Sequence, residues 1–177
     1  MSITKVLFGA ALVALAAGNT LADRGDQLPT TNAKSLGEVR FRFDSSVLPD
    51  NVSTLLAATV AYADAHPGTR IVLDAHCDPI GTSPYNTGLA IRRAESVRTE
   101  LRALGVPDEQ LVLAIYGKEG AHRATYPEDR RVTVWSTTAP VATVIDRTFA
   151  GQGIAVRWER PLTVAEIQAP PELVARR

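Results

Sequence analysis

The chain has 177 residues, enough for one ordinary globular domain with a short addition but not for a two-domain enzyme. Hydrophobic residues make up 45% of it and charged residues 21%, which excludes an intrinsically disordered protein. Nineteen basic residues balance nineteen acidic ones, so the surplus of positive charge that non-specific nucleic-acid binding needs is missing.

Residues 1–22 have the pattern of a cleaved signal peptide. Lys5 precedes an apolar run at residues 6–17, and Thr20-Leu21-Ala22 supplies small residues before Asp23. The run is shorter than the roughly 20 residues of a membrane-spanning helix, so we expect an exported mature chain without a membrane span. Its formal charge is −1, from 18 basic and 19 acidic residues once Lys5 is removed. No cysteine stands at the cleavage site, so an acylated form is not expected.

A polar linker is predicted at residues 23–37, which show neither helical nor strand periodicity. Residues 39–43 alternate apolar and basic side chains, which is typical of a half-buried strand. Between residues 49 and 66, apolar residues recur at steps of three and four. This spacing predicts an amphipathic helix that ends at Pro67-Gly68.

A second strand is predicted at residues 70–75, and a loop follows at residues 76–84. A helix capped by Ser83 should then extend to Leu104. Two more strands are predicted at residues 111–116 and 131–136, with a polar loop between them. This order indicates an α+β domain over residues 38–138, with helices on one side of a mixed four-stranded sheet.

Residues 139–177 form a predicted C-terminal extension. The apolar runs 143–145 and 154–156 flank Gly151-Gln152-Gly153, a pattern that predicts a β-hairpin. Two interpretations of the extension remain open: it adds an edge or a covering strap to the sheet, or it contacts partner proteins.

Arg93 differs from the other arginines of the second predicted helix. On a helical wheel it lies at the edge of the apolar stripe formed by Ala90, Val97 and Leu101, whereas Arg92 points away. Asn86 lies on the same line as Arg93. A guanidinium beside buried surface favours a carboxylate partner, because it is always charged and offers paired donors.

Asp78 follows the second predicted strand, and ligands of open α/β sheets favour the carboxyl ends of strands. Asp78 and Arg93 could together hold the ammonium and carboxylate of an amino acid. The residue pattern alone favours the other interpretation, in which the two side chains form an ion pair with each other.

The region around these residues resembles the signature of OmpA-like peptidoglycan-binding domains. That signature has a Gly-His-Thr-Asp segment, then a glycine, Tyr-Asn, Leu-Ser and Arg-Arg-Ala before a valine, and later Asn-Arg-Arg-Val. In this chain the corresponding segments are Ala75-His76-Cys77-Asp78, Gly81, Tyr85-Asn86, Arg92-Arg93-Ala94 with Val97, and Asp129-Arg130-Arg131-Val132. The resemblance begins at Val39 and covers about a hundred residues.

The resemblance implies an OmpA-like βαβαββ fold and non-catalytic binding of peptidoglycan. The ligand would be the diaminopimelate of the wall's stem peptide, gripped by Asp78 and Arg93. The protein would be periplasmic, would need no cofactor, and would be associated with the outer membrane through a partner. Asn86, Arg131 and Ser46 match other binding positions. Cys77 replaces the usual threonine, Ala75 the glycine and Asp129 the asparagine.

Two other functions compete with this expectation. His66, His76, His122 and Cys77 suggest a thiol hydrolase or a metal site, but no spacing supplies an oriented base, an oxyanion hole or a zinc pattern, so we expect neither an enzyme nor a metal. The serious alternative is an interaction module for envelope proteins, with the same fold and a weakened peptidoglycan site.

Overall fold

A computed structural model describes residues 32–121, 126–153 and 155–158, the last of these by backbone alone. The predicted signal peptide 1–22, most of the predicted linker, His122 and the end of the extension from residue 159 lie outside the described residues. Among the helices of the described part, none has the length and apolar character to cross a bilayer.

The described chain alternates strands and helices in the predicted order. The strands are β1 (Lys34–Arg40), β2 (Arg70–His76), β3 (Leu111–Gly117), β4 (Arg131–Thr137) and β5 (Ala155–Trp158). The α-helices are α1 (Ser53–Ala65), α2 (Ser83–Ala103), α3 (Tyr126–Asp129) and α4 (Val141–Ala150), with 3-10 turns at Asp50–Val52 and Asp108–Gln110.

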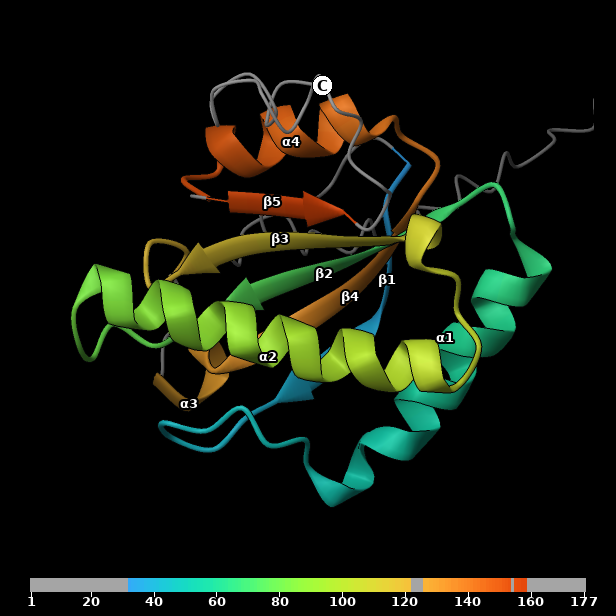
Figure 1. Ribbon diagram of the computed structural model, residues 1–177. Helices are drawn as coiled ribbons and strands as arrows, with labels where there is room; N and C mark the ends of the chain where they lie inside the picture. The colour runs from blue at the N-terminus through green and yellow to red at the C-terminus, as the bar shows by residue number, and fades with distance from the viewer. Residues whose placement is uncertain (1–31, 122–125, 154, 159–177) are drawn as a thin grey trace, which may run out of the picture.

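The strands form one mixed sheet in the order β1-β4-β2-β3-β5. β2 and β3 are parallel, and every other neighbouring pair is antiparallel. The predicted α+β class and mixed sheet are therefore confirmed, and β5 adds a fifth strand beside β3. Figure 1 shows α2 lying along the sheet, with α1 near its C-terminal end and α4 next to β5.

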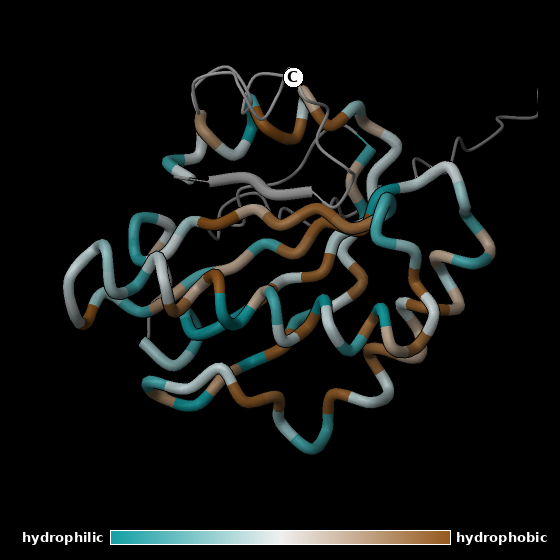
Figure 2. Tube along the Cα trace, viewed as in Figure 1, coloured by the Kyte–Doolittle hydropathy of each residue, from teal (hydrophilic) through white to brown (hydrophobic). Residues whose placement is uncertain are grey.

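The two faces of the sheet carry separate apolar clusters, because side chains alternate along each strand. Leu73, Leu113 and Val134 face α1 and α2 in the larger cluster. Val72 and Val112 face the opposite side, where Val144 of α4 packs against them. Figure 2 shows hydrophobic residues concentrated along the central strands, which are covered on both faces.

The predicted hairpin in the extension is wrong in its first arm. Residues 143–145 belong to α4, whose buried side chains Val144, Ile145 and Thr148 share one helical face. A three-residue apolar run does not distinguish a strand from a helix, because both periods fit so short a segment. The second arm does form a strand, β5, on the edge of the sheet. The extension thus covers one face and one edge.

Two predicted boundaries also move. β1 begins at Lys34, so residues 34–37 of the predicted linker pair with β4, and Phe43 lies beyond the strand with its side chain exposed. The N-cap of α2 is Thr82, whose hydroxyl accepts a hydrogen bond from the Tyr85 amide at 3.4 Å, rather than Ser83. Pro84 occupies the first turn, where its missing amide hydrogen costs nothing.

Candidate functional site

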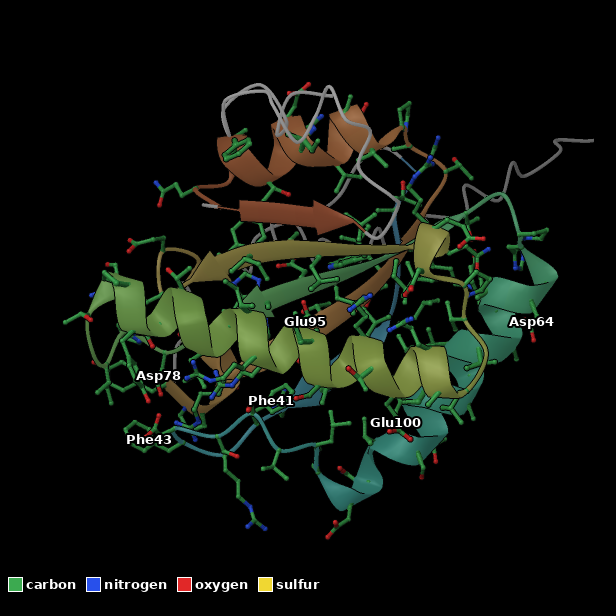
Figure 3. All side chains as sticks on the ribbon, in the orientation of Figure 1. Phe41, Phe43, Asp64, Asp78, Glu95 and Glu100 are labelled. Atoms are coloured by element: carbon green, nitrogen blue, oxygen red, sulfur yellow. The ribbon has the colours of Figure 1, made fainter. Side chains whose placement is uncertain are left out.

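A partly open pocket of about 190 Å³ lies where the carboxyl end of β2, the loop after β1 and the N-terminal half of α2 meet. In Figure 3, Phe43 and Asp78 lie together at this end, whereas Asp64 and Glu100 lie toward the other. The pocket is lined by Phe43, Asp44, Asp78, Ile80, Gly81, Tyr85, Asn86, Leu89 and Arg93. Three residues predicted from sequence, Asp78, Asn86 and Arg93, are therefore brought to one cavity.

Arg93 is fully buried and fixes the loop after β1. Its Nε donates to the carbonyl of Ser45 at 2.9 Å and its Nη2 to that of Arg42 at 3.2 Å. Nη1 donates to the carbonyl of His76 at 3.1 Å and to Sγ of Cys77 at 3.3 Å. These contacts join α2 to two loops that are distant in sequence, so the pocket wall depends on this side chain.

The positive charge of Arg93 has no carboxylate within bonding distance among the described residues. Burial lowers its pKa, which means that the folded protein has moved the cation out of water at a cost. A guanidinium has five N–H donors, and the contacts above use four of them. One donor on Nη2 has no hydrogen-bond partner among the described residues.

Asp78 is held in the loop after β2 and is 4% exposed. Its Oδ1 accepts a hydrogen bond from the Ile80 amide at 3.2 Å, and its Oδ2 lies 3.3 Å from Nη1 of Arg130. The ion pair between Asp78 and Arg93, favoured from pattern alone, is therefore wrong: each side chain has other partners. Both charges line the pocket as separate groups.

Asn86 and Cys77 hold the backbone around the pocket in place. Nδ2 of Asn86 donates to the Ile80 carbonyl at 2.9 Å, which holds the loop that carries Asp78. Cys77 is fully buried and does not line the cavity; its thiol donates to the Asn86 carbonyl at 3.3 Å and accepts from Arg93. In this chain the sulfur takes a positioning contact that a hydroxyl could also make.

Ser46 and Arg131, also predicted as binding residues, do not line this pocket. It is the backbone of Ser45 that contacts Arg93, and Arg131 is buried beside Asp129, with Nη1 to Oδ1 at 3.3 Å. Sequence reasoning missed Arg130, which reaches Asp78 instead. Strand alternation could have separated the two arginines, because consecutive residues at the start of β4 point to opposite sides of the sheet.

Asp44 and Tyr85 were missed as well. Asp44 follows the exposed Phe43 and has a left-handed backbone, with φ of 51°. Its carboxylate accepts a hydrogen bond from the Tyr85 hydroxyl, which raises the pKa of that phenol. This contact connects the two sides of the pocket mouth across 41 positions of sequence.

The arrangement does not suit nucleophilic catalysis. Burial raises the pKa of Cys77 to about 11, so the sulfur is a neutral thiol at physiological pH. The His76 ring lies on the opposite face of the sheet, with Nε2 at 2.6 Å from Oδ1 of Asp74 and stacked on Tyr116. Within the described ranges no three metal-ligating side chains of the His, Cys, Asp or Glu type gather at one point.

The βαβαββ order of residues 34–137, with its pocket at the end of β2, defines a known class of small α+β domain. The chain belongs to the OmpA family, whose model matches residues 40–133. The match includes the complete α1-to-β3 region and both residues Asp78 and Arg93.

The chain is also similar to proteins named peptidoglycan-associated lipoprotein. It is 32% identical to that of Pasteurella multocida over 75% of this chain and 97% of the relative, and 34% identical to that of Legionella pneumophila over 58% and 61%. This chain thus spans less than two thirds of the Legionella protein. A crystal structure of the Burkholderia pseudomallei protein matches with 35% identity and a TM-score of 0.52, covering 57% of this chain and 90% of that one.

Proposed function

We propose that this protein binds peptidoglycan without cleaving it, through the diaminopimelate of the stem peptide, and so anchors a periplasmic protein to the cell wall. The observation that carries the proposal is the pair of separate charges in one pocket, the Asp78 carboxylate and the buried Arg93 guanidinium. The names of the relatives point to the same polymer.

The two charges suit the free amino-acid end of diaminopimelate, which carries an ammonium and a carboxylate on one carbon. The ammonium would bind Asp78, which already accepts one amide hydrogen. The carboxylate would accept the remaining N–H of Arg93. Because folding has already desolvated and fixed Arg93, binding an anion there loses little side-chain entropy and gains a charge-assisted hydrogen bond.

Arg130 does not line the pocket but places a second positive group next to Asp78. Its side chain is 17% exposed and holds Asp78 through one contact, while its Nε donates to the Phe41 carbonyl at 3.3 Å. We propose that Arg130 keeps the Asp78 carboxylate in place before the ligand arrives. A ligand ammonium then shares Asp78 with Arg130 rather than displacing it, since a carboxylate accepts about four hydrogen bonds.

A pull-down on purified sacculi tests the proposal. Mature protein should sediment with sacculi and be released by meso-diaminopimelate but not by Nα-acetyl-lysine amide, whose side chain ends in an ammonium with no carboxylate on the same carbon. Asp78→Asn and Arg93→Lys should weaken retention at least about tenfold, since each weakens a charge-assisted hydrogen bond. Asp64→Asn, on the exposed surface of α1 at the other end of the molecule, and Arg147→Lys, exposed on α4, are matched controls.

Circular dichroism should show that all four variants remain folded. Retention of Asp78→Asn at the wild-type level would remove Asp78 from the site. If folded wild-type protein stays in the supernatant at every protein concentration tested, wall binding is refuted, and the interaction module for envelope proteins becomes the better description of this domain.

A further inference from the structure

We infer that the protein has a second subsite, centred on Arg42, for a carboxylate on the peptide residue next to the diamino acid. This inference rests on the proposed function, because it extends the same ligand beyond the first pocket. It would make the protein sensitive to a chemical feature of the wall, namely whether that neighbouring carboxylate is free or amidated.

The subsite is a separate cavity on the other side of the loop after β1. It measures about 340 Å³ and is lined mainly by polar groups. Its lining residues are Arg40, Arg42, Ser45, Val47, Leu48, Pro49 and Asp50.

The two cavities share a wall. Phe43 and Asp44 line the first, Arg42 and Ser45 line the second, and all four belong to one short stretch of backbone. Arg93 fixes this stretch through the carbonyls of Arg42 and Ser45. A ligand whose free amino-acid end lies in the first pocket can therefore extend its peptide end across this stretch toward the second cavity.

The charges of the second cavity favour an anion. Arg42 is exposed, and its guanidinium makes no ion pair or hydrogen bond within the described residues. Arg40 is partly neutralised by Glu38, with Nε to Oε2 at 3.4 Å, and Asp50 is the one acidic residue among those that line the cavity. Arg42 thus supplies the positive group that a carboxylate can reach, and the planar guanidinium suits bidentate binding of that carboxylate.

Three ligands test the subsite by calorimetric titration of the mature protein: meso-diaminopimelate, γ-D-glutamyl-diaminopimelate with its free α-carboxylate, and the same dipeptide with that carboxylate amidated. Wild-type protein should bind the acid form about fivefold more tightly than the amide, which is the scale of one solvent-exposed charge pair. Arg42→Gln should abolish this preference and leave the affinity for diaminopimelate unchanged.

Arg147→Gln makes the same charge change on exposed α4 and should retain the preference. The preference should also decrease as salt rises from 50 to 500 mM, because the pair is exposed. If diaminopimelate binds but Arg42→Gln retains the acid preference, or wild type shows none, the subsite is refuted and the first pocket stands. Failure of diaminopimelate itself to bind refutes the proposed function and, with it, this subsite.

Discussion

Truncation of Val144 to alanine tests whether the C-terminal extension is part of the folded domain. Val144 is fully buried and packs on the sheet face formed by Val72, Val112 and Tyr116. The change removes two methyl groups, worth about 0.8 kcal/mol each in transfer free energy, and leaves a cavity. We therefore expect the free energy of unfolding to fall by about 2 kcal/mol, and Tm by about 4–8 °C for a chain of this size.

Differential scanning calorimetry of the mature protein gives the Tm, and Val47→Ala is the matched control. Val47 is 78% exposed, so the same truncation there should change the free energy of unfolding by less than about 0.5 kcal/mol. Diaminopimelate affinity should be unaffected by Val144→Ala, because Val144 lies across the sheet from the pocket. Equal Tm values for the two variants would mean that α4 does not pack on the sheet in solution.

Cys77 and Gly117 provide the remaining predictions. At pH 8, Cys77 in the native protein should resist iodoacetamide for hours, because it is buried with a pKa of about 11. In 8 M urea it should react within minutes. Rapid modification of the native protein would contradict the burial of Cys77. Because the pKa of Cys77 is raised on folding, the unfolded protein releases the thiol proton near pH 9 while the folded protein keeps it. The stability that is present below pH 9 should therefore be lost as the pH rises toward 11. Urea unfolding at pH 8 and pH 10 should show a larger loss in wild type than in Cys77→Ala, where only the tyrosines with raised pKa contribute, and equal losses would refute it. Gly117→Ala should destabilise the fold by about 1–2 kcal/mol, since φ is 59° and a Cβ would lie 3.3 Å from the Thr87 amide nitrogen; an unchanged urea midpoint would exclude this strain.

Local periodicity in the sequence was sufficient to predict the main elements of the domain. The continuous apolar run of β3 and the long amphipathic α2 were placed within one or two residues of their observed bounds, because burial imposes a period that is visible in a single segment. The candidate residues Asp78, Asn86 and Arg93 could be named because a resemblance to a family added information that spacing did not contain.

The tertiary structure decided which groups meet. Arg93 contacts carbonyls 48 and 51 positions earlier in the chain, and Asp78 meets an arginine 52 positions later, so neither partner was visible in a local pattern. Asp78 pairs with Arg130 and not with Arg131, because the two side chains leave the start of β4 in different directions. The helical state of α4 likewise depends on the sheet face that it covers, because an apolar triplet fits a strand or a helix until a packing partner selects one.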